Sequence, residues 1–174
     1  NKITSALFKL LADNGVESHF VEKIDDNNQI VKRVTITPLE VIVRNITTGS
    51  LCKRLGLEEG KVLPRPLFEM CYKDDALGDP FIIEDHALLF GWATKEEIDK
   101  IKETSLRVNE ILKDYFAKKG VVLVDFKLEF GKDADGNLIL ADEISPDTCR
   151  FWDSSTGDHL DKDRFRKDLG NVLG

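Results

Sequence analysis

The sequence has few of the residues on which disulfide, zinc and histidine chemistry depend. Its three cysteines, at positions 52, 71 and 149, are odd in number and lack any Cys-x-x-Cys spacing. That usage favours reduced thiols over a disulfide framework. The three histidines, at positions 19, 86 and 159, are scattered along the chain. This scatter argues against a zinc centre and against histidine-based catalysis.

Long apolar runs, glycine-rich phosphate loops and an excess of basic residues are also absent. No stretch approaches the roughly 20 apolar residues of a membrane-spanning helix, and no signal peptide is recognisable. No Gly-x-Gly pattern occurs, which excludes the usual dinucleotide fingerprint. The net charge of −7 argues against a general nucleic-acid binder. We therefore expect a soluble cytoplasmic protein with neither a membrane nor a nucleic acid as partner.

What is present is the composition and patterning of a globular α+β domain. The 174 residues are 41% hydrophobic and 33% charged, which is enough for one substantial core. Thr94 and Glu97 form a capping-box signal at the start of a long predicted helix that ends before Gly120. Its predicted buried stripe comprises Ile98, Ile101, Val108, Ile111, Leu112, Tyr115 and Phe116. Apolar spacing predicts another helix over residues 3–11, with strands over 18–23 and 29–36. We predict helices packed on an antiparallel sheet.

Charged and apolar residues alternate in the segment LVDFKLEFG. In a strand, one face of this segment is apolar and the other carries Asp125, Lys127 and Glu129. The Asp-Gly pair at positions 135–136 is a strong signal for a two-residue hairpin turn. With that turn, the register predicts that Glu129 lies opposite Asp142.

Two carboxylates opposed on a sheet cost up to about 1 kcal/mol unless a cation lies between them. Magnesium is usually held by one or two carboxylates together with water and phosphate oxygens. The pair therefore favours a magnesium and nucleotide-phosphate site, where Lys127 is placed to bind a phosphate or carboxylate oxygen. Two alternatives stay open: a hairpin whose charged face is merely solvated, and a one-residue slip that replaces Asp142 by Glu143.

A second polar set follows the apolar strand predicted over residues 39–43. Arg44 ends this strand, and a polar turn leads to Ser50 and a short helix that carries Lys53 and Arg54. Ser50 is a suitable N-cap, and the free amides of a helix start, together with an arginine, attract an anion. The segment fits a phosphate site, although the Gly-Ser pair taken alone favours an ordinary capped helix with a basic outer face.

Six segments taken together are specific enough to indicate a family. They read ITPLEVIVRNITTGS, GSLCKRLGLEEG, KDDALGDP, LVDFKLEFG, ADEISPDTCRFWD and DKDRFRKDLG. In this order and spacing they resemble the SAICAR synthetase (phosphoribosylaminoimidazole-succinocarboxamide synthase) family of purine biosynthesis. The resemblance implies an ATP-dependent ligase that condenses L-aspartate with the carboxylate of the ribonucleotide CAIR. The products would be SAICAR, ADP and phosphate, formed by way of an acyl phosphate.

The resemblance also implies roles for individual residues. Glu129 and Asp142 correspond to magnesium ligands beneath the phosphates of ATP. Arg44 and Ser50 correspond to residues that hold the ribose phosphate of CAIR, and Arg150 joins that substrate phosphate site.

By the same resemblance, further matching positions would line the substrate pocket. Asp125 is assigned the catalytic role of proton acceptor, and Lys127 that of steadying the transferring phosphoryl group of ATP. Asp147 lines the same pocket. Lys73 and Asp79 match a loop that reaches the reacting ends of the substrates, although by composition alone this loop is only an acidic turn.

The fold implied by the resemblance is a two-lobed α+β fold of the ATP-grasp or kinase-like kind. Residues 1–37 would be a remnant of the N-terminal nucleotide-binding lobe, most of which is missing, because nothing here matches its glycine-containing strand pair. Residues 38–174 would form the substrate- and metal-binding lobe. Ile36 lies in the connector against which adenine would pack, and a buried edge strand is the alternative.

Two other functions remain open at this point. A lobe that binds a phosphorylated nucleotide without turning over ATP would be a non-catalytic or oligomerising fragment. A small-molecule kinase would share the carboxylate pair and the lobes. The basic residues Lys162, Arg164 and Arg166 are interpreted as a solvated helix face, with substrate contact as the alternative. The main expectation is a homo-oligomeric enzyme that uses ATP and Mg²⁺.

Overall fold

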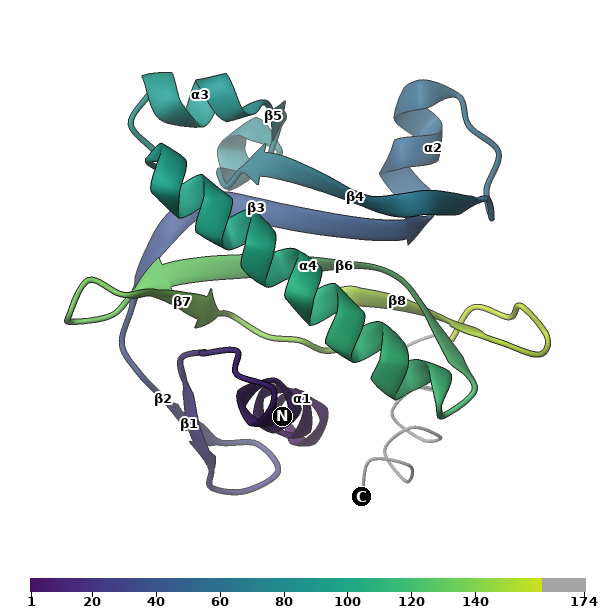
Figure 1. Cartoon of the computed structure of the whole chain (residues 1–174), viewed down its shortest axis with the longest axis horizontal. Coiled ribbons are helices and arrows are strands. Elements are labelled where there is room, and N and C mark those ends of the chain that lie inside the picture. Colours follow the sequence, from purple (N-terminus) through teal and green to yellow (C-terminus); the bar gives the residue numbers. More distant parts are fainter. Residues whose placement is uncertain (161–174) are drawn as a thin grey trace.

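The computed structural model describes residues 1–160 of the chain. Its centre is an antiparallel sheet in the order β5-β4-β3-β6-β7, with β8 also paired to β6. The strands are β3 (Thr35–Ile46), β4 (Val62–Tyr72), β5 (Phe81–Ile82), β6 (Val121–Lys132), β7 (Leu138–Ala141) and β8 (Cys149–Asp153). The long helix α4 (Lys95–Ala117) crosses one face of this sheet (Figure 1). The predicted α+β class with antiparallel strands and packed helices is confirmed.

The long helix forms as its sequence pattern predicts. The Thr94 hydroxyl accepts from the Glu97 backbone N–H at 3.2 Å, and the Glu97 carboxylate accepts from the Thr94 N–H at 3.1 Å. The predicted stripe is buried except for Tyr115, which is half-buried. Asn109 on the same helix exchanges two side-chain hydrogen bonds with Asn45 of β3, at 2.8 and 3.0 Å. These bonds fix α4 on the sheet. Separately, no helix in the described part of the chain is long and apolar enough to cross a membrane.

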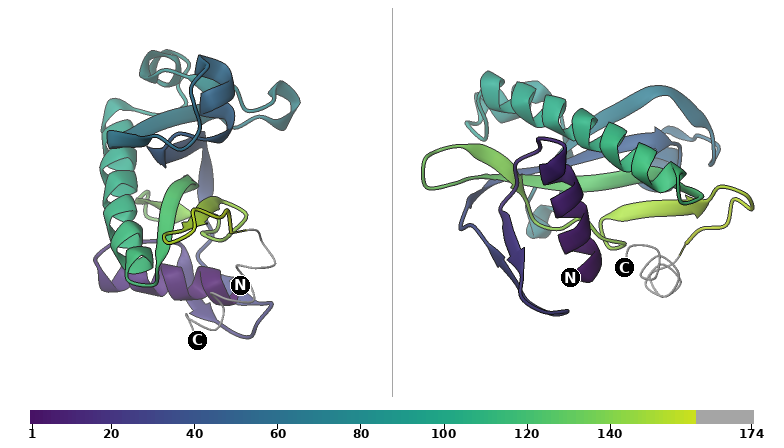
Figure 2. Two further views of the ribbon diagram at one scale, coloured as in Figure 1. Left: turned by 90° about the vertical axis from the view of Figure 1, so that its right-hand side faces the viewer. Right: turned by 60° about the horizontal axis from the view of Figure 1, so that its bottom comes forward.

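The N-terminal part consists of α1 (Lys2–Asp13) and a separate hairpin of β1 (Phe20–Lys23) and β2 (Gln29–Val31). Leu7, Phe8 and Leu11 of α1 belong to the same buried cluster as residues of β3, β6 and α4. Figure 2 shows α1 beside the C-terminal end of α4, where the two helices line one shallow pocket. The division into lobes at residue 37 stays a prediction.

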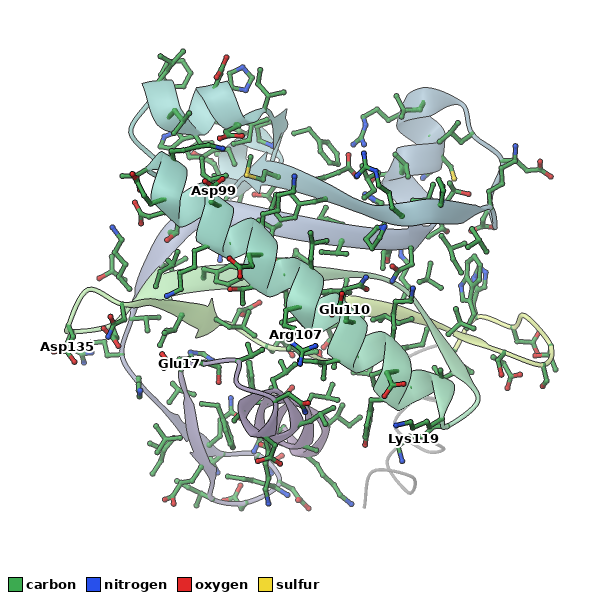
Figure 3. All side chains as sticks on the ribbon, viewed as in Figure 1. Glu17, Asp99, Arg107, Glu110, Lys119 and Asp135 are labelled. Atoms are coloured by element: carbon green, nitrogen blue, oxygen red, sulfur yellow. The ribbon has the colours of Figure 1, made fainter. Side chains whose placement is uncertain are left out.

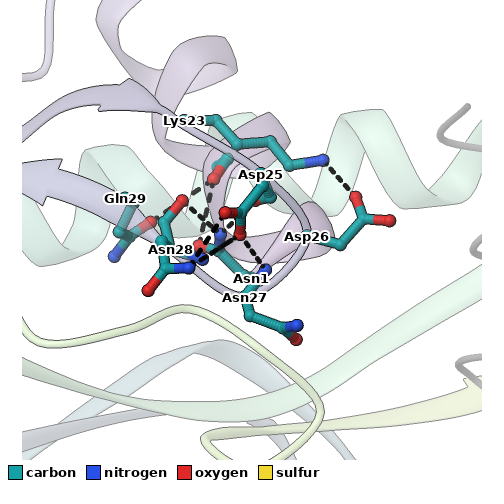
Figure 4. A network of polar contacts seen from close by, with 8 residues as sticks. Asn1, Lys23, Asp25, Asp26, Asn27, Asn28 and Gln29 are labelled. Atoms are coloured by element: carbon teal, nitrogen blue, oxygen red, sulfur yellow. Dashed lines mark hydrogen bonds and ion pairs between the residues drawn. The ribbon is translucent and has the colours of Figure 1, made fainter.

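Polar contacts tie the β1–β2 loop to the start of α1 (Figure 4). The Asn1 side-chain amide donates to the backbone carbonyls of Asp25 at 2.8 Å and Asn28 at 2.9 Å. The Asp25 carboxylate accepts from the backbone N–H groups of Asn27 and Asn28, at 2.8 Å each. The turn lies between the two strands that the sequence predicts, and it forms because an aspartate side chain can bond to the backbone two and three residues ahead.

The β6–β7 hairpin forms, but its predicted register is wrong by one residue. Asp133 pairs with Asn137 across the turn, so the loop has three residues and Glu129 lies opposite Ala141. The Asp133 carboxylate accepts from the backbone N–H groups of Asp135 and Asn137, at 2.9 Å each. Gly136 takes the left-handed φ of +80° that such a loop needs. Asp135 therefore lies at the tip of the hairpin (Figure 3).

Three short helical segments complete the described fold. They are α2 (Gly49–Leu55), the 3₁₀ turn η1 (Asp75–Leu77) and α3 (Glu84–Leu89). They lie beside β4 and β5, on the far side of the molecule from α1 (Figure 1). The face of the sheet that α4 covers carries the hydrophobic core. Charged side chains lie on the opposite face.

Candidate active site

The charged row predicted on β6 is confirmed, and it is buried rather than solvated. Asp125 is 5% exposed and Glu129 is 4% exposed. Across the β3–β6 ladder, Arg44 pairs with Asp125 and Glu40 pairs with Glu129. Two carboxylates do oppose each other, but the partner of Glu129 is Glu40, which the sequence analysis missed.

Each acid of this pair is bound by one lysine. Lys127 Nζ lies 3.1 Å from Glu40 Oε1, and Lys73 Nζ lies 2.6 Å from Glu129 Oε2. Burial raises the pKa of Glu129; the hydrogen bond from Lys73 opposes the rise and the nearby charge of Asp142 adds to it. Burial lowers the pKa of Lys73 and Lys127, but their acidic partners outweigh it and raise both. The lysines therefore stay charged while Glu129 carries a cost of burial.

Asp142 lies near this cluster although it does not pair with Glu129 across the strands as predicted. It follows the last residue of β7 and has a left-handed φ of +57°. This turn of the backbone ends the strand, and the charge of Asp142 acts on Glu129, Lys73 and Lys127. The two predicted metal ligands therefore lie in one electrostatic cluster although they do not pair across the strands.

Arg44 lies at the centre of a second network and is only 2% exposed. Its Nε donates to Glu69 Oε1 at 2.7 Å, and its two terminal nitrogens donate to Asp125 at 3.3 Å and to the Ser50 hydroxyl at 3.0 Å. The other Glu69 oxygen binds Arg54. The prediction that Ser50 is the N-cap is wrong, because Ser50 lies inside the helix that begins at Gly49; its hydroxyl accepts from Arg44 instead.

Helix α2 begins instead at a glycine, after a residue in an extended conformation. Thr48 is the N-cap residue but makes no side-chain capping bond, and Gly49 has a φ of +58°. A Cβ on Gly49 would overlap the guanidinium group of Arg150. Gly49 thus allows Arg150 of β8 to lie against the start of α2, close to Arg44.

These residues surround one cavity of about 370 Å³. Burial raises the pKa of Asp125 at its floor, although Arg150 and Arg44 oppose the rise. Arg150 is half exposed and lies 3.6 Å from Asp125. The cavity brings together six of the predicted site residues: Arg44, Ser50, Asp125, Lys127, Asp147 and Arg150.

Other predicted residues lie outside this cavity. Ile36 is 39% exposed and pairs with Gly131, near the hairpin end of β6. Asp79 shapes its own loop, since its carboxylate accepts from the Asp74 N–H at 2.9 Å and its φ is +49°. The basic residues Lys162, Arg164 and Arg166 lie outside the described part of the chain.

The thiols take no part in these networks. All three cysteines are free. Burial raises the pKa of Cys71 to about 11 and that of Cys149 to about 12. Neither is a thiolate at neutral pH, so neither is activated as a nucleophile.

Comparison with known proteins identifies the family of this chain. The family model described as SAICAR synthetase matches residues 1–174. The chain belongs to the SAICAR synthetase family. The phosphoribosylaminoimidazole-succinocarboxamide synthase of Clostridium botulinum (strain Eklund 17B / Type B) is 60% identical over 172 residues, which cover 99% of this chain and 73% of that protein.

Solved structures agree with the assignment. A SAICAR synthetase (Type-2) in complex with ADP has a TM-score of 0.90 and 54% identity, covering 99% of this chain and 73% of that one. The SAICAR synthetase (Type-1) of Pyrococcus horikoshii OT3 has a TM-score of 0.88 and 53% identity, covering 99% and 76%. The predicted family, fold class and function as an ATP-dependent carbon–nitrogen ligase of purine biosynthesis are confirmed.

Proposed function

We propose that the buried polar face of the central sheet binds the substrates and the metal in the condensation of L-aspartate with CAIR. The observation that carries the proposal is the convergence of six predicted residues on one cavity. The cluster around Glu129 adjoins this cavity through Lys127, which lines it and pairs with Glu40. Cations for phosphate groups and carboxylates for a metal are thus available on one rigid sheet.

The chemistry needs positioning and charge neutralisation rather than a protein nucleophile. A carboxylate oxygen of CAIR attacks the γ-phosphorus of ATP, the bond to the ADP oxygen breaks, and an acyl phosphate forms. The amine of aspartate then attacks the acyl carbon, phosphate leaves, and the nitrogen loses a proton. The residues must align these groups and exclude water from the activated carboxyl.

Lys127 and Asp125 are the residues we assign to these steps. Lys127 is half-buried on the wall of the cavity, where its ammonium group can bind the oxygens of the transferring phosphoryl group. Asp125 lies two residues before it, with a pKa raised by burial. A raised pKa brings a carboxylate closer to the range of a general base that takes the proton of the amine.

Arg150, Ser50 and Arg44 form the proposed site for the ribose phosphate of CAIR. Arg150 supplies a half-exposed guanidinium group at the cavity wall, which suits two-pronged binding of a phosphate. Arg44 is already bonded to Glu69, Asp125 and Ser50. We therefore assign Arg44 mainly to holding the shape and positive charge of this wall.

The donor set of Glu129 and Asp142 fits magnesium. Both offer carboxylate oxygens, the ligands that magnesium prefers, and two carboxylates match its usual protein contribution. Within residues 1–160 no group of three or more histidine, cysteine or acidic residues could hold a metal by itself, so phosphate oxygens and water would complete the shell. When bound, magnesium would neutralise phosphate charge on ATP. Lys73, which pairs with Glu129, would then be free to bind substrate.

The test is the dependence of ADP release on aspartate. The chain is supplied with ATP, Mg²⁺ and CAIR, with and without L-aspartate, and ADP and the CAIR product are measured. ADP release that requires aspartate, with SAICAR as product, supports ligation. Aspartate-independent ADP release with a stable phosphorylated product would contradict it and favour a kinase. Homo-oligomerisation and a cytoplasmic location stay predictions.

A further inference from the structure

Asp142 has an unusual backbone conformation at the end of β7. Its φ of +57° is positive, and among the described non-glycine residues only Asp79 shares this feature. The left-handed conformation costs most non-glycine residues roughly 1–2 kcal/mol. Aspartate adopts it more readily, and surrounding contacts stabilise it in a folded chain. A contact that fixes the backbone of Asp142 therefore also fixes the direction in which its side chain leaves the main chain.

His19, between α1 and β1, makes such a contact. Its Nε2 lies 2.9 Å from the backbone carbonyl oxygen of Asp142. Because a carbonyl oxygen can only accept, Nε2 must carry the hydrogen. The residue is 9% exposed, and the His19 ring packs edge-on against Phe8 with 5.5 Å between centroids. The donor is therefore held by the helix packed behind it.

The main chain of His19 is fixed as well. Its N–H donates to the Leu140 carbonyl at 2.8 Å, and its own carbonyl accepts from the Lys32 N–H at 2.6 Å. Leu140 is two residues before Asp142, so His19 holds the end of β7 at two points. The imidazole is thus a hydrogen-bond donor held in one position, and it orients the peptide group after Asp142.

We propose that His19 is a positioning residue for the metal site, whose Nε2–H holds the Asp142 carbonyl so that the Asp142 carboxylate is presented toward Glu129. This inference rests on the proposed function, in which Asp142 binds the metal. Replacing a residue that orients a metal ligand without touching the metal commonly lowers metal affinity by about 10- to 100-fold. His19 is distant in sequence from Asp142, so no short sequence motif contains the two residues.

The test compares two replacements that fill the space of the imidazole. His19→Gln keeps an N–H donor at similar reach, and His19→Met does not. Mn²⁺ is the probe, and its binding in the presence of ADP is measured by electron paramagnetic resonance, with thermal unfolding recorded for each variant. We expect His19→Met to weaken Mn²⁺ binding about tenfold or more and His19→Gln to retain most of the wild-type affinity.

Asp142→Asn separates this inference from the proposed function. If Asp142→Asn loses Mn²⁺ affinity while the glutamine and methionine variants bind alike, the positioning role is wrong and the metal site stands. If Asp142→Asn binds Mn²⁺ as the wild type does, the proposed metal site fails and the inference fails with it. Should His19→Met not fold, His19→Asn replaces it, since its shorter amide does not reach the carbonyl. Affinity equal to that of His19→Gln would then overturn the proposal.

Discussion

At the scale of single residues, burial distinguishes this site from a solvated charged face. Glu129 and Asp125 are almost fully buried, and burial raises the pKa of both. Selection for stability alone would not favour two buried acids on a central sheet, one of them, Glu129, opposite a third acid, Glu40. Such a cost is typical of functional sites, where activity and stability oppose each other.

Glu129→Gln should therefore stabilise the protein in a pH-dependent way. The folded pKa of Glu129 is raised, so protonation favours folding, and stability from this group is present at low pH and lost as pH rises through the folded pKa. The advantage of the variant should be largest at pH 7–8 and vanish near or below the ordinary glutamate pKa of 4.5. Thermal unfolding from pH 4 to pH 8 measures this. Glu103→Gln, on the exposed side of α4, is the control, and an advantage independent of pH would refute the explanation.

Arg44→Ala should be among the most destabilising single changes. It removes the cation that joins Glu69 and Asp125, and breaking a buried pair by removing one partner costs about 3–5 kcal/mol. Arg54→Ala removes a one-third-exposed partner of the same Glu69 and should cost about 1 kcal/mol or less. Urea unfolding gives both values. Equal losses would show that Arg44 is not the centre of the network.

At the scale of elements, the sequence predicts what depends on local pattern and misses what depends on pairing. The helix α4 is correctly predicted because its capping box and apolar stripe are local signals. The β6–β7 register is wrong by one residue because the Asp133 side chain selects a three-residue loop. Glu40 is missed because it is a single acid in an apolar run, and its pairing with Glu129 arises only when distant strands meet.

The start of α2 offers a matched pair of glycines for the next prediction. Gly49 and Gly56 have similar φ values of +58° and +64°, so alanine should cost each about 1 kcal/mol in backbone strain. Only at Gly49 would the new Cβ overlap Arg150, since nothing lies within 4 Å of a Cβ at Gly56. Gly49→Ala should therefore also weaken CAIR binding, measured by calorimetry. Equal CAIR affinity in the two variants would contradict the placement of Arg150.

At the scale of the whole molecule, the two faces of the sheet have different roles. One face packs against α4 and α1 and supplies the hydrophobic core, and the other holds the charged networks on β3, β4, β6 and β8. The chain is acidic overall, at −7, so in the proposed function anionic substrates would depend on the local cations Lys73, Lys127 and Arg150. The sequence predicts each of these cations as a separate site residue. Only the fold shows that Lys73 and Lys127 form ion pairs with buried acids of the same sheet.

Binding of Mn²⁺ in the presence of ADP tests the central claim most directly. The affinity is measured by electron paramagnetic resonance for the wild type, Glu129→Gln and Asp142→Asn. Asp135→Asn, at the exposed tip of the same hairpin, is the control. We predict that each of the first two replacements weakens Mn²⁺ binding by about tenfold or more, because each removes a charged oxygen ligand, and that the control does not. Unchanged affinity in both site variants would contradict the account.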